Sequence, residues 1–411
     1  MFYFSSLQNA KNMTTYTILI ILSGLVIFSY LFDLVASKTK IPSILLLLLL
    51  GIGLRFLVGY LKIQTFNFLS ILPTLGTVGL ILIVFEGSLE LKYDKDKNKI
   101  IRSAFFSALT ILLGTATIIT LIIYQISHAS LYTCIANAIP FSVISSAIAI
   151  PSAAALGKQN KEFVIYESSF SDILGIIIFN FAITNHSITT SSFIGLGLST
   201  FLIIFLSSIA CMVLLYIMGR LVHHIKFFLI ISILILVYAI GQSYHLSSLV
   251  LILSTGLFLN NADAIQNLWF RTTFLYKNLS SDLSQLYQLS AESAFILRTF
   301  FFVIFGFTMN VSELNDKPIL MNGFFILATI YAVRFACLKV FKTGAIAPII
   351  YIAPRGLISI LLYFNLPDSL KIVQVGTSFL FLVVLGSSIV MTFGLILSKK
   401  TGEIPVTTNG G

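Results

Sequence analysis

The chain has 411 residues, of which 57% are hydrophobic and only 10% are charged, and its mean hydropathy is +1.01. Because an ordinary soluble domain carries about 25% charged residues, this composition excludes a soluble enzyme, a disordered chain and a disulfide-stapled domain. The net charge of +10 does not indicate nucleic-acid binding, since the Lys and Arg residues lie in short gaps between apolar runs rather than on one folded face.

About 13 apolar stretches approach the length of roughly 20 residues that a membrane-spanning helix needs. In chain order they are 15–36, 41–60, 68–90, 101–125, 131–157, 162–184, 193–219, 225–243, 246–260, 292–312, 319–341, 346–365 and 372–397. The ninth is the shortest, and prolines interrupt the fifth and the twelfth. The sequence therefore predicts an all-α polytopic membrane protein with about 13 transmembrane helices.

Charges between the stretches predict their orientation. With the N-terminus outside, 17 of the 25 Lys and Arg residues fall on the inside, four fall outside and four lie within spans. Such an excess is typical of cytoplasmic loops. We therefore expect an external tail over 1–14, a transmembrane domain over 15–397 and a cytoplasmic tail over 398–411, in the cell (inner) membrane.

The longest loop, 261–291, lies on the predicted cytoplasmic side and mixes aromatic with polar residues, among them Trp269 and Tyr276. Two interpretations fit this composition, namely an interfacial helix that lies on the membrane and an ordered connector. The three cysteines lie inside apolar runs without disulfide or zinc spacing, which indicates small core residues.

Charged residues inside the spans are the main functional candidates, because an unpaired charge at mid-bilayer costs at least a few kcal/mol. They are Glu86, Glu167, Asp172, Arg298, Arg334 and Arg355.

The sixth span holds two of these carboxylates. Asp172 shares a helix face with Ser168, four residues earlier, and has Ser171 beside it. A carboxylate with nearby hydroxyls offers the oxygen ligands that a small hard cation prefers. Glu167 points elsewhere, which suggests an ion pair with a buried Arg. The alternative for Asp172 is a structural pair with Arg298 or Arg355.

Glu86 ends an apolar run in the third span and has two interpretations. It lies at the bottom of a water-filled funnel, or it snorkels toward the cytoplasmic edge, where Lys92 follows within reach.

The fifth and twelfth spans each carry a proline-containing interruption, at 148–151 and 353–356. Discontinuous helices at corresponding places in two halves are typical of an inverted-repeat transporter. Arg355 would neutralise carbonyl ends that such breaks expose. Two ordinary proline kinks are the alternative.

Five motifs in order resemble the monovalent cation:proton antiporter superfamily, in its sodium–proton exchanger (NhaP/Kef-like) branch, over about 20–397. They are IPSIL at 41–45, FEGSLEL at 85–91, ESSFSD at 167–172, FFVIFGF at 301–307 and APRGL at 353–357. The resemblance implies an inverted-repeat antiporter fold with two crossed discontinuous helices. It also implies a homodimer whose subunits have two bundles, one dimerising and one moving as an elevator.

The resemblance also implies roles for individual residues. Asp172 is the carboxylate that binds either the cation or the proton, with Ser168 and Ser171 beside it, and Glu86 assists this ion site. Glu167 pairs with Arg334.

Arg355 is implied to compensate the crossed helix ends.

Two departures from the family's pattern matter here. Ala149-Ile150 stands where exchangers carry Thr-Asp, so a second site carboxylate is missing and only the main-chain carbonyl of Ala149 remains as a ligand. Ser171-Asp172 stands in place of Asn-Asp, which removes an amide that would brace the crossing. A single carboxylate argues against an electrogenic exchanger with two aspartates.

The expected function is secondary active exchange of Na⁺ or K⁺ for H⁺ by competition at Asp172, with the bilayer as environment and with no cofactor, enzymatic activity or nucleic-acid partner. The intramembrane arginines motivate an alternative, an anion or organic-solute carrier on the same scaffold. The missing Thr-Asp pair motivates another, a degenerate, sensor-like exchanger homologue. An intramembrane aspartyl protease is opposed by the presence of one deep aspartate where two are needed.

Overall fold

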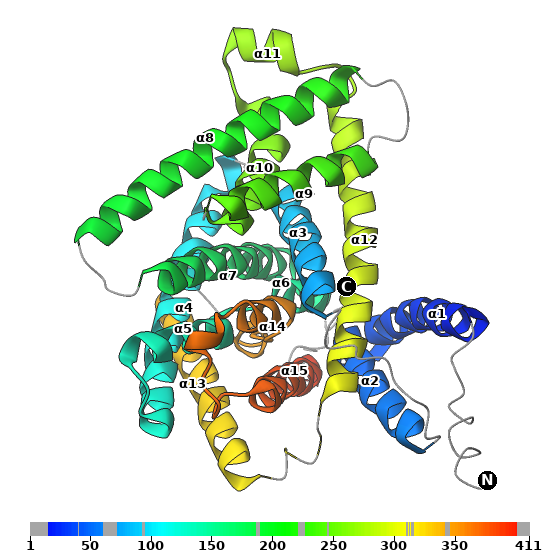
Figure 1. The fold of residues 1–411 in the computed structure, drawn as a ribbon, viewed down its shortest axis with the longest axis vertical. Coiled ribbons are helices and arrows are strands. Elements are labelled where there is room, and N and C mark those ends of the chain that lie inside the picture. The colour runs from blue at the N-terminus through cyan, green and yellow to red at the C-terminus, as the bar shows by residue number, and fades with distance from the viewer. Residues whose placement is uncertain are drawn as a thin grey trace, which may run out of the picture. The chain divides into compact units, whose positions relative to one another are not determined.

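In the computed structural model, the described residues are nearly all helical and contain no strand (Figure 1). The described residues are 15–39, 41–60, 72–92, 95–185, 190–220, 227–244, 246–309, 311, 313, 316–341 and 346–400. The predicted all-α class is confirmed. Residues 1–14 and 401–411, which belong to the predicted tails, lie outside the described residues.

Seven helices within the described ranges are long and apolar enough to cross a membrane. They are Ser43–Tyr60, Asn98–Ser127, Leu131–Ser152, Thr200–Arg220, Leu279–Thr308, Lys317–Phe341 and Thr377–Ser398. Three shorter apolar helices are Leu22–Ala36, Phe227–Ser243 and Ser248–Asn260. The multi-pass architecture agrees with the sequence analysis, and the count of about 13 spans stays a prediction.

The chain divides into two compact units. Unit 1 contains residues 1–34, 43–94 and 184–309, and unit 2 contains 35–42, 95–183 and 310–411. Each unit draws on both halves of the sequence, so its core forms only when distant segments meet.

Unit 1 holds most of α1 and all of α2, α3 and α8 to α12. The bounds are α1 Thr15–Thr39, α2 Ser43–Tyr60, α3 Leu72–Glu90, α8 Thr190–Arg220, α9 Phe227–Ser243, α10 Ser248–Asn260, α11 Leu268–Phe274 and α12 Leu279–Thr308, with the 3₁₀ turn η4 at Ala262–Ala264. Helix α12 packs against α2 and α3, and α10 packs against α3, α8 and α9.

Helices α2 and α12 approach each other at two glycines. A Cβ on Gly51 would meet the Val303 carbonyl oxygen and would lie 2.8 Å from the Phe307 nitrogen. A Cβ on Gly306 would meet the carbonyl oxygen of Leu48. Small residues let membrane helices pack backbone to backbone, so these glycines set the distance between α2 and α12.

Gly51→Ala is expected to destabilise unit 1 by about 1–3 kcal/mol, because its methyl group would collide with main-chain atoms that cannot rotate away. Gly53→Ala is the matched control on the same helix, since nothing lies within 4 Å of its Cβ position. The control should keep or raise the melting temperature, because alanine favours a helix by about 1 kcal/mol over glycine. Equal melting temperatures for the two purified variants would contradict this packing.

The second half of the predicted 261–291 loop belongs to α12, so the predicted end of that loop at residue 291 is wrong. Helix α12 begins at Leu279, well before the predicted start at 292. Leu279, Leu286 and Ser290 are buried on one side of it, and Asp282 lies in its first turn, where a carboxylate is favourable. The polar residues of this stretch therefore form the exposed face of an amphipathic helix.

Unit 2 holds the remaining helices. Their bounds are η2 Lys95–Lys97, α4 Asn98–Ser127, α5 Leu131–Ser142, α6 Ser146–Ser152, η3 Ala153–Ala155, α7 Lys158–Thr184, α13 Lys317–Phe341, η6 Ile349–Tyr351, α14 Leu357–Phe364, η7 Asp368–Leu370 and α15 Thr377–Lys400. Helix α4 packs against α5 and α13, and α15 packs against α13 and η6.

Two chain segments in unit 2 are broken. Residues 143–145 separate α5 from α6, and residues 352–356 separate η6 from α14. The second break falls where the sequence predicts it. The first does not, because 148–151 lie inside α6 and both Pro140 and Pro151 are accommodated within helices. A proline removes one N–H group, whereas a break needs partners for several freed groups, and those lie beside 143–145.

Candidate functional site

The two breaks meet in unit 2. The Ser145 N–H donates to the Pro354 carbonyl oxygen at 2.9 Å. A Cβ on Gly356 would lie 2.6 Å from the Ser145 Oγ and 2.8 Å from the Ile148 Cδ1, so glycine leaves room for these two side chains at the crossing. The crossing is therefore held by main-chain contact between two discontinuous helices.

Helix α7 supplies acceptors to the first break. The Ser171 Oγ accepts the Ile144 N–H at 2.9 Å, and the Asp172 Oδ2 accepts the Ser146 N–H at 3.1 Å. Both side chains are buried. Together with the Ser145 bond, three successive N–H groups of the break find three different acceptors, which explains why the helix is interrupted here.

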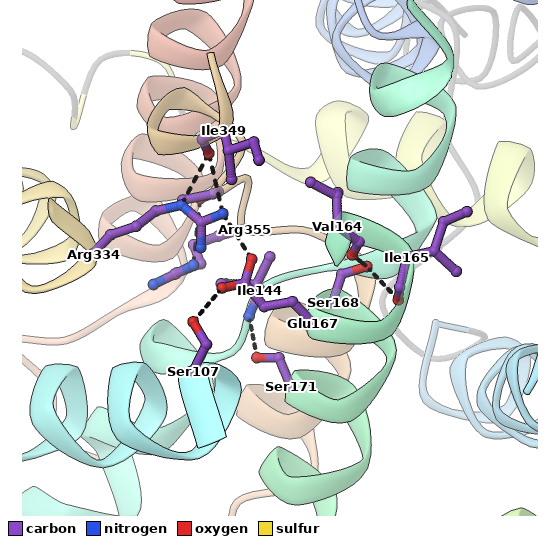
Figure 2. Close-up of polar contacts among 11 residues, drawn as sticks. Ser107, Ile144, Val164, Ile165, Glu167, Ser168, Ser171, Arg334, Ile349 and Arg355 are labelled. Carbon is purple, nitrogen blue, oxygen red and sulfur yellow. Dashed lines mark hydrogen bonds and ion pairs between the residues drawn. The ribbon is translucent and has the colours of Figure 1, made fainter. Parts of the chain in front are cut away.

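Ser171 does brace the crossing, contrary to the expectation that the missing amide leaves it unbraced. Its hydroxyl oxygen binds the freed Ile144 N–H directly (Figure 2). A serine can accept this bond as an amide oxygen would. The geometry therefore assigns Ser171 first to the backbone.

Ser171→Ala is expected to lower the stability of unit 2 by about 1–3 kcal/mol, since it leaves the buried Ile144 N–H without an acceptor. Ser168→Ala is the matched control on the same helix, because the Ser168 hydroxyl donates to carbonyls of its own helix, at Val164 and Ile165. Thermal unfolding of the purified variants measures the difference. A larger loss for Ser168→Ala would contradict the bracing role.

Two of the predicted ion ligands near Asp172 already take part in hydrogen bonds of their own helices. Ser168 lies one turn before it on α7, with its proton engaged as described. Ala149 lies inside α6, and its carbonyl oxygen accepts the Ala153 N–H. Each of these oxygens retains a second lone pair, so each can still face a cation.

A buried ion pair joins α7 to α13. The Arg334 Nη2 lies 2.8 Å from the Glu167 Oε2, and the two side chains are 0% and 1% exposed. The Ser107 hydroxyl donates to the other carboxylate oxygen at 2.7 Å, and Arg334 also donates to the Ile349 carbonyl at 3.1 Å (Figure 2). This ion pair thus connects α4, α7, α13 and η6.

Arg355 is fully buried in the second break. Its Nε donates to the Phe141 carbonyl at 2.7 Å, and its Nη1 donates to the Ala353 carbonyl at 3.3 Å. Phe141 lies in the last turn of α5, whose carbonyl end carries partial negative charge, so the guanidinium compensates a helix end. The Ser387 Oγ on α15 accepts the Arg355 main-chain N–H at 2.9 Å.

Sequence reasoning missed Ser107 and Ser387. Both are serines in apolar spans that hold many other serines, and nothing local distinguishes them. Their contacts are long-range, so only the fold reveals them.

Glu86 lies in unit 1, whereas Asp172 lies in unit 2. The Arg298 Nη2 lies 3.3 Å from the Glu86 Oε1, on a side chain that is 12% exposed. Glu90, one turn later, accepts the Tyr287 hydroxyl at 2.9 Å. Lys92, which the snorkelling interpretation invoked, pairs instead with Asp263 at 2.9 Å, so the basic partner of Glu86 is Arg298.

Two asparagines at the end of α10 bind the C-terminal end of α3. The Asn260 amide donates to the Leu89 carbonyl at 2.7 Å, and the Asn261 amide donates to the Leu91 carbonyl at 3.0 Å. The carbonyl groups that a helix leaves open at its C-terminus are thereby satisfied.

No resident metal site occurs among the described residues, in the sense that no three His, Cys, Asp or Glu side chains gather. Cys134, Cys211 and Cys337 are buried free thiols, as their apolar surroundings predict.

Comparisons with known proteins agree with this architecture. The model of the family described as "Sodium/hydrogen exchanger, transmembrane" matches residues 22–399. A comparison with curated proteins finds no match.

Among solved structures, the chain is similar to the sodium proton antiporter MjNhaP1 from Methanocaldococcus jannaschii at pH 8. The TM-score is 0.68 at 18% sequence identity, covering 92% of this chain and 100% of that chain. A 3D electron-microscopy map of the same antiporter gives a TM-score of 0.63 at 18% identity, covering 94% and 96% of the two chains. The expected antiporter fold is confirmed by this likeness.

Proposed function

Since the chain belongs to the sodium/hydrogen exchanger family, we propose that it exchanges one monovalent cation, Na⁺ or K⁺, for one H⁺ at the carboxylate of Asp172. One observation carries the proposal. Asp172 is 7% exposed and lies where two discontinuous helices cross, with one carboxylate oxygen on the first N–H of α6. The family is one of transporters, which agrees with the expectation that the chain is not an enzyme.

Exchange follows from the cost of burying a charge. A carboxylate inside the membrane is stable when a proton or a bound cation neutralises it. The two occupants exclude each other, because a protonated carboxyl group is a poor ligand for a cation. Only a neutralised site can pass the hydrophobic barrier at low cost, and this couples the two fluxes.

One carboxylate carries a single negative charge, which either one proton or one monovalent cation neutralises, so the proposed stoichiometry is one cation for one proton. Ile150, which stands where the family resemblance leads one to expect an acid, supplies no second charge. Ser168 and the Ala149 carbonyl complete the proposed ligand set, with Ser171 beside Asp172. Glu167, Arg334 and Arg355 have structural roles in this proposal.

The arginines that motivated an anion carrier are engaged elsewhere. Arg298 pairs with Glu86, Arg334 with Glu167, and Arg355 binds helix carbonyls. These contacts favour cation exchange over anion transport. We also propose a homodimer in the cell (inner) membrane, with the tail at 1–14 outside, the transmembrane domain over 15–397 and the tail at 398–411 in the cytoplasm.

Proteoliposomes with a pH-sensitive dye test the proposal. After a pH gradient is imposed, Na⁺, Li⁺ and K⁺ are added separately, with choline as the inert control. Dequenching by at least one metal cation is expected, and the Na⁺ rate should not change when valinomycin and balanced K⁺ collapse the membrane potential. Absence of dequenching with all three cations would refute exchange, and a strong dependence on potential would refute the one-to-one stoichiometry.

A further inference from the structure

A short helix, α11, packs at the end of a long apolar helix in unit 1. The last residues of α8 contact the segment that follows α11, since a Cβ on Gly219 would lie 3.1 Å from the Tyr276 ring. Phe270 is buried, and its ring centroid lies 5.3 Å from that of Phe274 on the same helix. One side of α11 is therefore fixed to the protein.

The other side of α11 is apolar and exposed. Leu268 is 80% exposed and Trp269 is 64% exposed. The helix has seven residues, too few to cross a bilayer. It lies beside a candidate span, Thr200–Arg220, whose surface carries exposed apolar side chains such as Phe205 and Val213. Exposed apolar side chains thus lie both on α11 and on the neighbouring candidate span.

Basic side chains lie on α11, just after it and at the end of the neighbouring helix α8. Arg220, Arg271 and Lys277 are exposed, and none of them forms an ion pair with another described residue. The Arg220 guanidinium lies 5.2 Å from the centroid of the Tyr216 ring, on the last turn of α8.

The nearby acids are already engaged. Asp263 pairs with Lys92 at 2.9 Å, and Asp282 accepts the Tyr276 hydroxyl at 2.8 Å. Burial, and then the Asp282 carboxylate, raise the pKa of Tyr276, so its hydroxyl remains a neutral donor. Among the described residues, the basic groups on and beside α11 thus outnumber the acids, so the local net charge is positive.

We propose that α11, together with Arg220, Arg271 and Lys277, is a binding site for the headgroup of an anionic phospholipid. Tryptophan prefers the boundary between acyl chains and headgroups. With Trp269 at this boundary, the neighbouring Leu268 would reach the acyl region. A guanidinium binds phosphate oxygens through two parallel hydrogen bonds. Apolar contact and charge complementarity thus select the same ligand at the same depth.

The chain's single tryptophan, Trp269, reports on this site without labelling. The purified full chain is reconstituted in bilayers that contain brominated phosphatidylcholine or brominated phosphatidylglycerol, and the quenching of Trp269 is measured. Each basic group near an anionic surface contributes about 1 kcal/mol, which corresponds to about a fivefold factor in binding. At least a fivefold preference for the phosphatidylglycerol is expected.

Arg271→Gln and Arg220→Gln are each expected to reduce that preference by about fivefold, while quenching by brominated phosphatidylcholine is unchanged. Lys371→Gln is the matched control, because it removes an equal charge from the loop before α15, in unit 2. Unchanged phosphatidylcholine quenching also shows that a variant is folded at α11.

Three outcomes would overturn the proposal. Equal quenching by the two lipids would exclude headgroup selectivity. Quenching by aqueous iodide with none by either brominated lipid would show that α11 faces water. An unaltered preference in both arginine variants would show that these side chains do not bind the headgroup.

Discussion

Asp172→Asn is expected to reduce cation-driven proton efflux to the level of protein-free liposomes. Asparagine can accept the Ser146 N–H through its amide oxygen, so the first turn of α6 keeps its partner. It cannot bind a proton or neutralise a cation, so both halves of the exchange are lost while the fold remains. Dye dequenching, measured beside the melting temperature, separates these two effects.

The matched control is Asp368→Asn. Asp368 is an exposed aspartate that pairs with Lys371 at 2.7 Å, and its substitution should leave the rate unchanged. Asp172→Glu keeps a carboxylate but displaces it by one methylene, so a reduced, cation-dependent rate is expected. Full activity in Asp172→Asn would show that another group carries the proton.

Arg334→Met is expected to cause the largest loss of stability, about 3–5 kcal/mol, because it leaves the buried Glu167 carboxylate without its counter-charge. Adding Glu167→Gln should recover part of the loss, since the second substitution removes the unpaired charge. Thermal unfolding of the two single variants and the double variant gives a double-mutant cycle that isolates the coupling.

The exposed pair of Lys92 and Asp263 provides the contrast. Its side chains are 63% and 54% exposed, so Lys92→Met should cost no more than about 1 kcal/mol. If Arg334→Met and Lys92→Met shifted the melting temperature equally, the Glu167 pair would not hold unit 2 together.

The helices were predictable from this sequence because long apolar segments identify membrane-spanning helices. Their interruptions were predictable only in part. The break at 352–356 coincides with Pro354 and Gly356, which are local signals. The break at 143–145 depends on acceptors from Ser171 and Pro354, which are distant in sequence, so the local signal at Pro151 pointed to the wrong place.

The same distinction applies to the candidate site. Asp172 stood out from the sequence because a lone carboxylate among apolar residues is costly. Its contact with the Ser146 N–H could not be read from the sequence, and neither could the contact of Arg298 with Glu86. The chain offers several other candidate partners for each of these groups. Composition identifies which groups need compensation, and only packing decides which group supplies it.

The strength of the hydrogen bond between the Ser146 N–H and Asp172 should depend on whether the carboxyl group is ionised or protonated. An ionised carboxylate is a stronger acceptor than a carboxylic acid, and α6 has only seven residues to keep its first turn wound. Proton uptake should therefore loosen the start of α6, and ionisation should tighten it. The amide hydrogen of Ser146, corrected for the intrinsic pH dependence of exchange, should exchange faster as Asp172 takes up its proton. The backbone at one helix end would then reveal which occupant the site holds.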